Sequence, residues 1–251
     1  MIEAKDIYKT FNGRTVMHGV SCVFEDGKTN LIIGKSGSGK TVLLKSLVGL
    51  YDVDCGAILY DGRDTTIMGR KERLKLRQEI GMIFQGSALF DYMTVLENVR
   101  FPLDMFSNLT AQERDMRAKE CLRRVNMEQQ SDNLFPAQIS GGMQKRVAIA
   151  RAIVQNPRYL FCDEPNSGLD PVTSGVIDTL ISEITHESGI TTIINTHDMN
   201  SVFTIGEHIV FIESGHKRWE GTQDNILKAE NEDLRNFMNS AVRLMERYKE
   251  G

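Results

Sequence analysis

Long apolar segments are absent from the sequence. No window approaches the roughly 18 consecutive apolar residues that a membrane-spanning helix needs. Glu3 and Asp6 stand where a signal peptide would have a basic start and an apolar stretch. We therefore expect a protein that works in the cytoplasm or as a peripheral protein on the cytoplasmic face of the inner membrane.

Cysteine pairs with metal-ligand spacing are absent as well. The sequence has four cysteines, Cys22, Cys55, Cys121 and Cys162, and no two of them form a C-x-x-C pair. At least two of them lie in apolar, strand-like segments. In the cytoplasm this pattern is typical of reduced, structural thiols.

An excess of basic residues is also absent. The net charge is −4, and lysine and arginine are scattered, so the sequence gives no sign of a nucleic-acid partner. The charged segment at residues 70–77 is typical of a solvated helix face. With 251 residues and 41% hydrophobic content, the chain is large enough for one α/β domain or for a core with an inserted lobe.

The remaining pattern predicts three regions in order. A small antiparallel sheet is expected from the strand-like segments at residues 2–8, 15–24 and 57–60. A helical lobe follows, in which Thr110 and Glu113 form a capping box. Buried parallel strands are expected at residues 159–162, 191–195 and 208–212, with a crossover helix at 172–187.

A glycine-rich loop lies between a short β segment at residues 29–33 and a helical pattern at 41–50, which is the context of a phosphate-binding P-loop. Its glycines let successive N–H groups point at a phosphate, and the start of the helix adds its positive dipole end. We expect Lys40 to bridge the β- and γ-phosphates of ATP and the Thr41 hydroxyl to bind Mg²⁺. The expected nucleotide-binding residues of this segment are Gly34, Lys35, Ser36, Gly37, Ser38, Gly39, Lys40, Thr41 and Val42.

Two carboxylates follow the apolar strand at residues 159–162. Asp163 ends this strand and is expected to face the Mg²⁺ ion. Glu164 would polarise a water aimed at the γ-phosphorus, which makes it the predicted general base. The spacing to Lys40 argues against a surface pair without a role.

Two polar residues follow other apolar strands. Gln85 could place its amide oxygen near the metal or the attacking water, and His197 could hydrogen-bond the γ-phosphate. A single histidine after a strand is more often structural. Because the same sequence also contains the P-loop and the two carboxylates described above, a catalytic role is favoured for both residues.

A second glycine-rich turn opens the helical pattern at residues 143–154. The N–H groups and the hydroxyl of Ser140, Gly141 and Gly142 would form an anion cradle at a helix N-terminus. Its occupant would be the γ-phosphate held by a second copy of the chain. A plain helix cap is the alternative, and a monomeric P-loop kinase or GTPase would leave the turn without a role.

These motifs, in this order, resemble the nucleotide-binding subunit of an ABC transporter. The resemblance covers residues 1–222 and assigns Walker A to 34–41, the Q-loop to Gln85, the signature to 139–143, Walker B to 159–163, the D-loop to 167–170 and the switch histidine to His197. It implies a P-loop (RecA-like) α/β core with an N-terminal antiparallel β subdomain and a helical subdomain inserted at about 90–157. It also implies a homodimer with ATP between Walker A of one subunit and the signature of the other.

The signature departs from the usual Leu-Ser-Gly-Gly-Gln by having Ile139 and Met143. Met143, with the segments at residues 84–91 and 164–171, is similar to the Mla-type (MlaF-like) phospholipid transporter ATPases. That resemblance implies an MlaE-like permease and an MCE-domain protein as partners. The alternatives are the ATPase of a small-solute importer, such as an amino-acid or metal importer, and a division-type ATPase without a transport role.

Three further expectations come with alternatives. Phe11, at the A-loop position of the family, would stack on adenine or belong to the core of the front sheet. The apolar residues Leu89, Phe90, Tyr92 and Met93 would line a groove for a permease helix or belong to the core of the lobe. The extension at residues 223–251 would form an amphipathic helix that clasps the twin subunit or packs on its own core.

Overall fold

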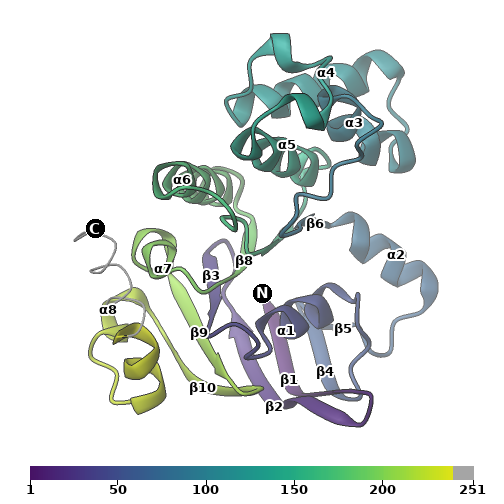
Figure 1. The fold of residues 1–251 in the computed structure, drawn as a ribbon. Coiled ribbons are helices and arrows are strands. Elements are labelled where there is room, and N and C mark those ends of the chain that lie inside the picture. The colour runs from purple at the N-terminus through teal and green to yellow at the C-terminus, as the bar shows by residue number, and fades with distance from the viewer. Residues whose placement is uncertain (240–251) are drawn as a thin grey trace. The chain divides into compact units, whose positions relative to one another are not determined.

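The computed structural model describes residues 1–239, which form two compact units. Unit 1 comprises Met1–Arg73 and the chain from Thr191 onward, and unit 2 comprises Leu74–Ile190. The ribbon views show the elements of both units (Figure 1).

An antiparallel sheet opens unit 1. Its strands are β1 (Ile2–Phe11), β2 (Arg14–Phe24), β4 (Cys55–Tyr60) and β5 (Arg63–Asp64). Their spatial order is β2-β1-β4-β5, and every neighbouring pair is antiparallel. The predicted front sheet is therefore confirmed, with strands a few residues longer than the sequence pattern indicated.

The second set of strands in unit 1 positions the P-loop. Strand β3 (Thr29–Ile33) pairs in parallel with β8 (Thr191–Thr196) and with β9 (His208–Glu213), and β9 pairs antiparallel with β10 (His216–Gly221). Every residue of β3 and β8 is buried, including the polar Asn30 and Asn195, so neither strand shows the alternation of a half-exposed strand. This unit also contains the helices α1 (Lys40–Val48), α7 (Met199–Ile205) and α8 (Gln223–Ile226).

The start of the predicted C-terminal helix packs on unit 1. Residues 232–239 are helical, and Leu234, Phe237 and Met238 are buried. The ring of Phe237 lies 5.5 Å from the ring of Phe211 in β9, measured between centroids. For these residues the structure supports packing on the chain's own core, whereas Ala241, Met245 and Tyr248 of the predicted helix lie outside the described residues.

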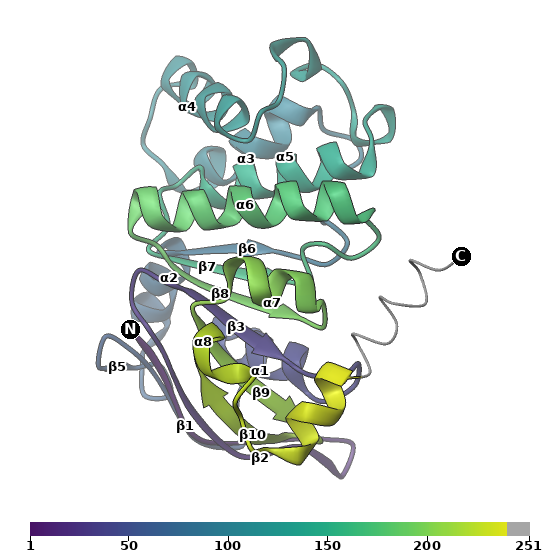
Figure 2. The same cartoon turned by 90° about the vertical axis from the view of Figure 1, so that its left-hand side faces the viewer.

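Unit 2 holds a parallel strand pair and a group of helices. Strand β6 (Ile80–Ile83) pairs in parallel with β7 (Tyr159–Asp163). Its helices are α3 (Val95–Phe106), α4 (Ala111–Arg124), α5 (Gly141–Ile153) and α6 (Pro171–Ser188), while α2 (Arg70–Gln78) begins in unit 1 and ends in unit 2. Two single 3₁₀ turns, Gln129–Ser131 and Pro136–Gln138, lie between α4 and α5. Helices α3, α4 and α5 pack together as the predicted helical lobe (Figure 2).

Local sequence explains where the lobe helices begin. Thr110 caps α4, accepting the Glu113 N–H at 3.3 Å while its own N–H donates to the Glu113 carboxylate at 2.7 Å. The predicted capping box is confirmed, and Thr94 forms the same arrangement with Glu97 at the start of α3.

The predicted α/β fold class is confirmed by this architecture. All four cysteines are free thiols, and burial raises the pKa of Cys22 to about 12, so this thiol stays protonated at neutral pH. The boundaries of an ATPase domain at 1–222, a helical insertion at about 90–157 and an extension at 223–251 stay predictions.

Candidate functional site

The P-loop of unit 1 fills the space between β3 and α1. Gly34 has a left-handed backbone with φ 150°, and a Cβ at this position would lie 2.1 Å from the Ile212 carbonyl oxygen. Only glycine fits there, because the loop passes directly against the end of β9. The loop then enters α1, whose N-terminal N–H groups have no partner within a helix and are suited to a phosphate.

Lys40 is the buried cation of this loop. Its ammonium donates to the carbonyl oxygens of Gly34 at 2.9 Å and Lys35 at 3.0 Å, and the residue is only 4% exposed. The Ser38 hydroxyl is buried and has no hydrogen-bond partner among the described residues. A buried charge and an unpaired hydroxyl in one loop fit the phosphate chain of a nucleotide, which would supply acceptors for both.

Thr41 and His197 are brought to the same edge of the parallel strands. The Thr41 hydroxyl accepts a hydrogen bond from the Asn195 amide at 3.2 Å. Asn195 lies in β8, and His197 follows that strand as an exposed residue. The sequence analysis assigned no role to Asn195, although an asparagine directly after Ile193 and Ile194 in a predicted buried strand was a usable signal, and the structure shows it fully buried.

Phe11 lies at the end of β1 and is 36% exposed. Its ring contacts Tyr51 edge-on at 5.2 Å between centroids, and the Lys9 ammonium lies 5.2 Å from the ring centre. The exposure argues against a residue of the sheet core and supports the predicted role in adenine stacking. That role stays a prediction.

In unit 2 the structure joins two motifs that lie far apart in the sequence. Asp163 is the buried last residue of β7, and Glu164 follows it with a left-handed backbone at φ 45°. The Gln85 amide nitrogen donates to the Glu164 carboxylate at 3.1 Å and to the Ser167 hydroxyl at 3.2 Å. A carboxylate held by an amide in this way is suited to orient a water, as expected of a general base.

The signature turn caps α5. The Ser140 hydroxyl accepts the Met143 N–H at 3.3 Å, and Ser140 and Gly141 are exposed. Gly142 packs closely on α6, because a Cβ there would lie 2.9 Å from the Thr173 methyl carbon. The helix cap given as the alternative is therefore present, and anion binding by this exposed turn stays a prediction.

The predicted residues divide between the two units. Phe11, the P-loop residues 34–42 and His197 belong to unit 1, whereas Gln85, Ser140–Gly142, Asp163 and Glu164 belong to unit 2. Within the described residues, no group of three His, Cys, Asp or Glu side chains could hold a metal ion. The metal ligands expected from the sequence, Thr41, Gln85 and Asp163, each carry an oxygen atom, which suits Mg²⁺, and their role stays a prediction.

Comparison with known proteins gives consistent matches. A family model described as ABC transporter matches residues 17–167. The methionine import ATP-binding protein MetN of Carboxydothermus hydrogenoformans is 37% identical over 246 residues, which are 96% of this chain and 72% of that protein. The probable ribonucleotide transport ATP-binding protein mkl of Mycobacterium leprae is 35% identical over 239 residues, or 95% of this chain and 68% of that protein.

Solved structures agree with these relatives. The dimeric structure of MJ0796, described as a bacterial ABC transporter cassette, has a TM-score of 0.81 at 33% identity and covers 89% of this chain and 99% of its own. Another dimeric structure of that cassette is described as a post-hydrolysis state bound to ADP and Pi. The cbiO1 protein of Clostridium perfringens, part of the ABC transporter complex cbiONQ, has a TM-score of 0.82 at 28% identity and covers 99% of this chain and 98% of its own.

Proposed function

The chain belongs to the ABC transporter family, as an ATP-hydrolysing subunit that powers transport. From this premise we propose that it drives the import of a small solute through a membrane permease. The observation that carries this proposal is the similarity, along nearly the whole chain, to ATP-binding proteins named for methionine import and ribonucleotide transport. Importer ATPases were the alternative in the sequence analysis, and these relatives support that alternative better than lipid transport.

Lipid transport is the second candidate. It rests on Met143 and on the segments at residues 84–91 and 164–171, which resemble Mla-type ATPases. In that case the partners would be an MlaE-like permease and an MCE-domain protein, and the cargo would be a phospholipid. The relatives reported above carry no lipid in their names.

Either function would need two copies of the chain. The exposed Ser140 turn at the N-terminus of α5 is suited to the γ-phosphate of an ATP held by the P-loop of a second copy. The dimeric structures of the MJ0796 cassette support this arrangement. Mg²⁺ would accompany the ATP, with the Thr41 hydroxyl of the P-loop as its expected ligand in unit 1.

The permease would be a separate membrane protein. No helix among residues 1–239 is long and apolar enough to span a bilayer. As the ATPase of such a transporter, the chain would work on the cytoplasmic face of the inner membrane, held there by its partner.

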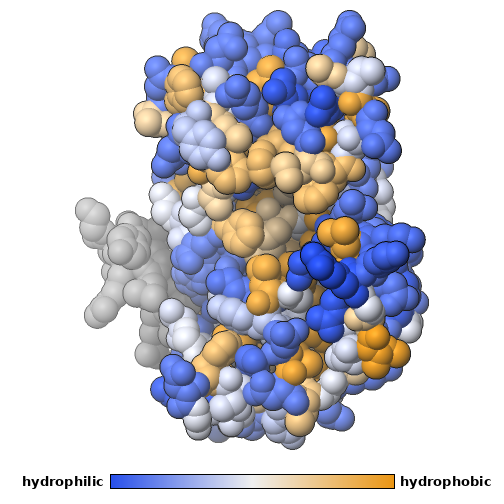
Figure 3. Space-filling view, turned by 90° about the vertical axis from the view of Figure 1, so that its right-hand side faces the viewer, coloured by the Kyte–Doolittle hydropathy of each residue, from blue (hydrophilic) through white to orange (hydrophobic). Residues whose placement is uncertain are grey.

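The helical lobe of unit 2 offers a surface for that partner. Of the four residues predicted to line a groove, Tyr92 is 74% exposed, whereas Phe90 packs on Phe101 with 4.7 Å between ring centroids. Phe90 thus belongs partly to the lobe core, as the alternative interpretation held. On the face drawn in Figure 3, hydrophilic side chains predominate in the upper part, and hydrophobic ones gather below them toward the middle of the face.

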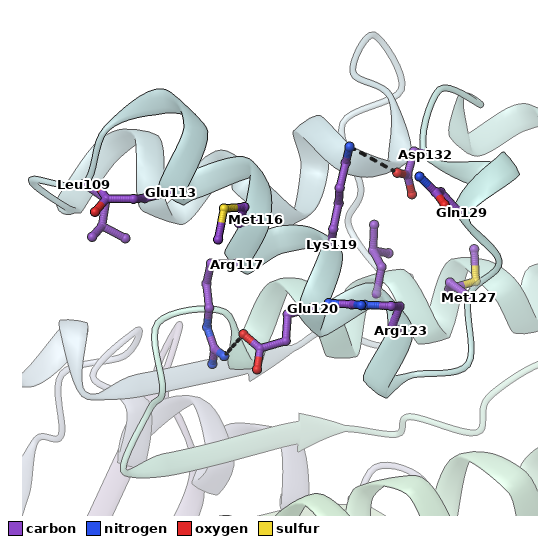
Figure 4. Close-up of a pocket in the computed structure, with 11 residues that line it drawn as sticks. Leu109, Glu113, Met116, Arg117, Lys119, Glu120, Arg123, Met127, Gln129 and Asp132 are labelled. Atoms are coloured by element: carbon purple, nitrogen blue, oxygen red, sulfur yellow. Dashed lines mark hydrogen bonds and ion pairs between the residues drawn. The ribbon is translucent and has the colours of Figure 1, made fainter.

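A cavity of about 650 Å³ lies along α4 (Figure 4). Apolar side chains line it together with charged ones, and four of the charged residues form two ion pairs, Arg117–Glu120 at 2.8 Å and Lys119–Asp132 at 4.0 Å. Leu109 and Met116 line it and are 40% and 63% exposed. A cavity lined by both apolar and charged side chains is suited to an amphipathic helix of the permease.

Charges placed in this cavity should weaken the complex. We expect Leu109→Glu and Met116→Glu to lower the recovery of the permease with the tagged chain about tenfold, because each variant removes apolar contact area and adds a carboxylate that loses water when the partner binds. Leu74→Glu in α2 is the matched control, since Leu74 is 50% exposed and lies outside the cavity. Unchanged recovery with both cavity variants would show that the permease binds elsewhere.

The complex recovered from membranes also decides the cargo. In proteoliposomes containing the complex, methionine, ribonucleotides and phospholipid would be supplied in turn, and ATP turnover measured. Stimulation by a small solute supports the importer, and stimulation by phospholipid with an MCE-domain subunit supports the second candidate. Recovery of the chain without any membrane protein would contradict both.

A further inference from the structure

The chain makes a strained turn directly after Gln85. Ser87 and Ala88 both have left-handed backbones, with φ 61° and 49°. The Ala88 N–H donates to the Gly86 carbonyl at 2.7 Å, so a γ-turn is centred on Ser87, and the positive φ identifies its rare, strained form. Residues other than glycine hold such a conformation only when their surroundings fix it.

Two cations of α5 supply that fixation. Arg151 donates to the carbonyl oxygens of Ser87 and Ala88, each at 2.7 Å. Lys145 donates to the carbonyl oxygen of Gln85. Three carbonyls of the turn are thus held by charged donors from one helix, and such hydrogen bonds are stronger than neutral ones.

Lys145 is buried and Arg151 is half-buried, which is unusual for charged side chains. Lys145 is only 6% exposed, and burial lowers its pKa, an effect that the Glu164 carboxylate opposes. Burial also lowers the pKa of Arg151. Lysine and arginine are seldom buried unless they hold a specific partner, and here the partners are the carbonyls of one turn.

The side chain of Gln85 points from this turn to the predicted base. Its amide nitrogen donates to Glu164 at 3.1 Å and to Ser167 at 3.2 Å. Because Lys145 of α5 holds the backbone carbonyl of Gln85, the position of the Gln85 amide relative to Glu164 depends on that hydrogen bond. Helix α5 itself begins at the Ser140 turn.

We propose that Lys145 and Arg151 form a cation clamp on the turn at residues 85–88, and that this clamp positions Gln85 against Glu164. Both are positioning residues, because they act through Gln85. The clamp ties the helix that starts at the Ser140 turn to the residue that holds the predicted base. This inference rests on the proposed roles of Gln85 and Glu164 in ATP hydrolysis.

The test uses the full chain with Lys145→Met, Lys145→Arg and Lys75→Met. Methionine keeps the apolar stem of the lysine and removes the donor, so the variant should fold, and the thermal midpoint checks this. Lys75 in α2 is exposed and provides the matched control. The first readout is amide hydrogen exchange of peptides covering residues 84–90, measured without nucleotide. The second readout is the kcat of ATP hydrolysis, measured together with the Kd for ATP.

In Lys145→Met we expect exchange of the Ser87 and Ala88 amides to rise at least about tenfold, as loss of one charged hydrogen bond would allow. We expect kcat to fall by about the same factor, while the Kd for ATP changes less than about threefold, since the P-loop is untouched. Lys145→Arg should restore most of both values, and Lys75→Met should match the parent.

Unchanged exchange in Lys145→Met would overturn the clamp, whatever happens to turnover. Faster exchange with an unchanged kcat would overturn its positioning role. The role of Gln85 in ATP hydrolysis is tested separately with Gln85→Ala. Parental turnover in that variant would refute the role of Gln85, and the exchange result for Lys145→Met would still hold.

Discussion

Replacing Glu164 by glutamine should lower ATP turnover by a factor of about 10²–10⁴, the range in which a positioned general base contributes. The carboxylate is held at 3.1 Å by the Gln85 amide, next to the buried Asp163, and glutamine would keep its size and lose its basicity. Binding of ATP should remain, because none of the P-loop groups is changed. Turnover of purified protein and equilibrium binding of a fluorescent ATP analogue would measure the two effects.

Glu187→Gln is the matched control for this substitution. Glu187 also lies in unit 2, is exposed and pairs with Arg124 at 2.8 Å on the surface. Surface pairs of this kind contribute little to stability, so the control should hydrolyse ATP at the parental rate. If Glu164→Gln also did so, Glu164 would not be the base.

Replacing Lys40 by alanine should weaken the binding of ATP itself. The lysine is the buried cation of the P-loop, and its charged hydrogen bonds would pass from the carbonyls of Gly34 and Lys35 to phosphate oxygens. A charged hydrogen bond contributes about 1.5–3 kcal/mol, so the Kd for ATP should rise about tenfold to one hundredfold. Titration calorimetry would measure the change.

Lys28→Ala serves as the control for Lys40→Ala, because it removes a lysine from unit 1 away from the loop. Lys28 is partly exposed and pairs with Glu25. Its loss should leave the Kd for ATP unchanged. An unchanged Kd in Lys40→Ala would mean that the loop holds something other than a triphosphate.

Much of the fold could be predicted from the sequence, because its local signals agree with the tertiary structure. The apolar segment at residues 29–33 became β3 with the same bounds, and the capping box at Thr110 set the start of α4. Strands β1 and β2 were predicted too short, because their outer residues are polar or partly exposed while the backbone pairing continues.

The site was predictable where a motif carries its own geometry. The P-loop did so, since glycine spacing, Lys40 and Thr41 are consecutive. The contact between Gln85 and Glu164 could be expected only from the family resemblance, because 79 residues separate them. The hydrogen bond from Lys145 to the Gln85 carbonyl could not be predicted, because the only signal in the sequence is a lysine on the apolar face of a helix.

Cargo was the least predictable property, for a physical reason. The residues that bind ATP are determined by phosphate chemistry, which all members of the family share. The cargo contacts other polypeptides, so its chemistry leaves little trace in this chain. Met143 and the segment at residues 84–91 suggested lipid, whereas the named relatives suggest small solutes.

The reciprocal use of two copies is tested most directly by measuring ATP turnover per chain and molecular mass in the same solutions across a dilution series. We predict that turnover per chain falls with the dimer fraction and approaches zero where only monomer remains. Full turnover per chain in solutions that contain only monomer would contradict a shared site built from the P-loop of one copy and the Ser140 turn of the other.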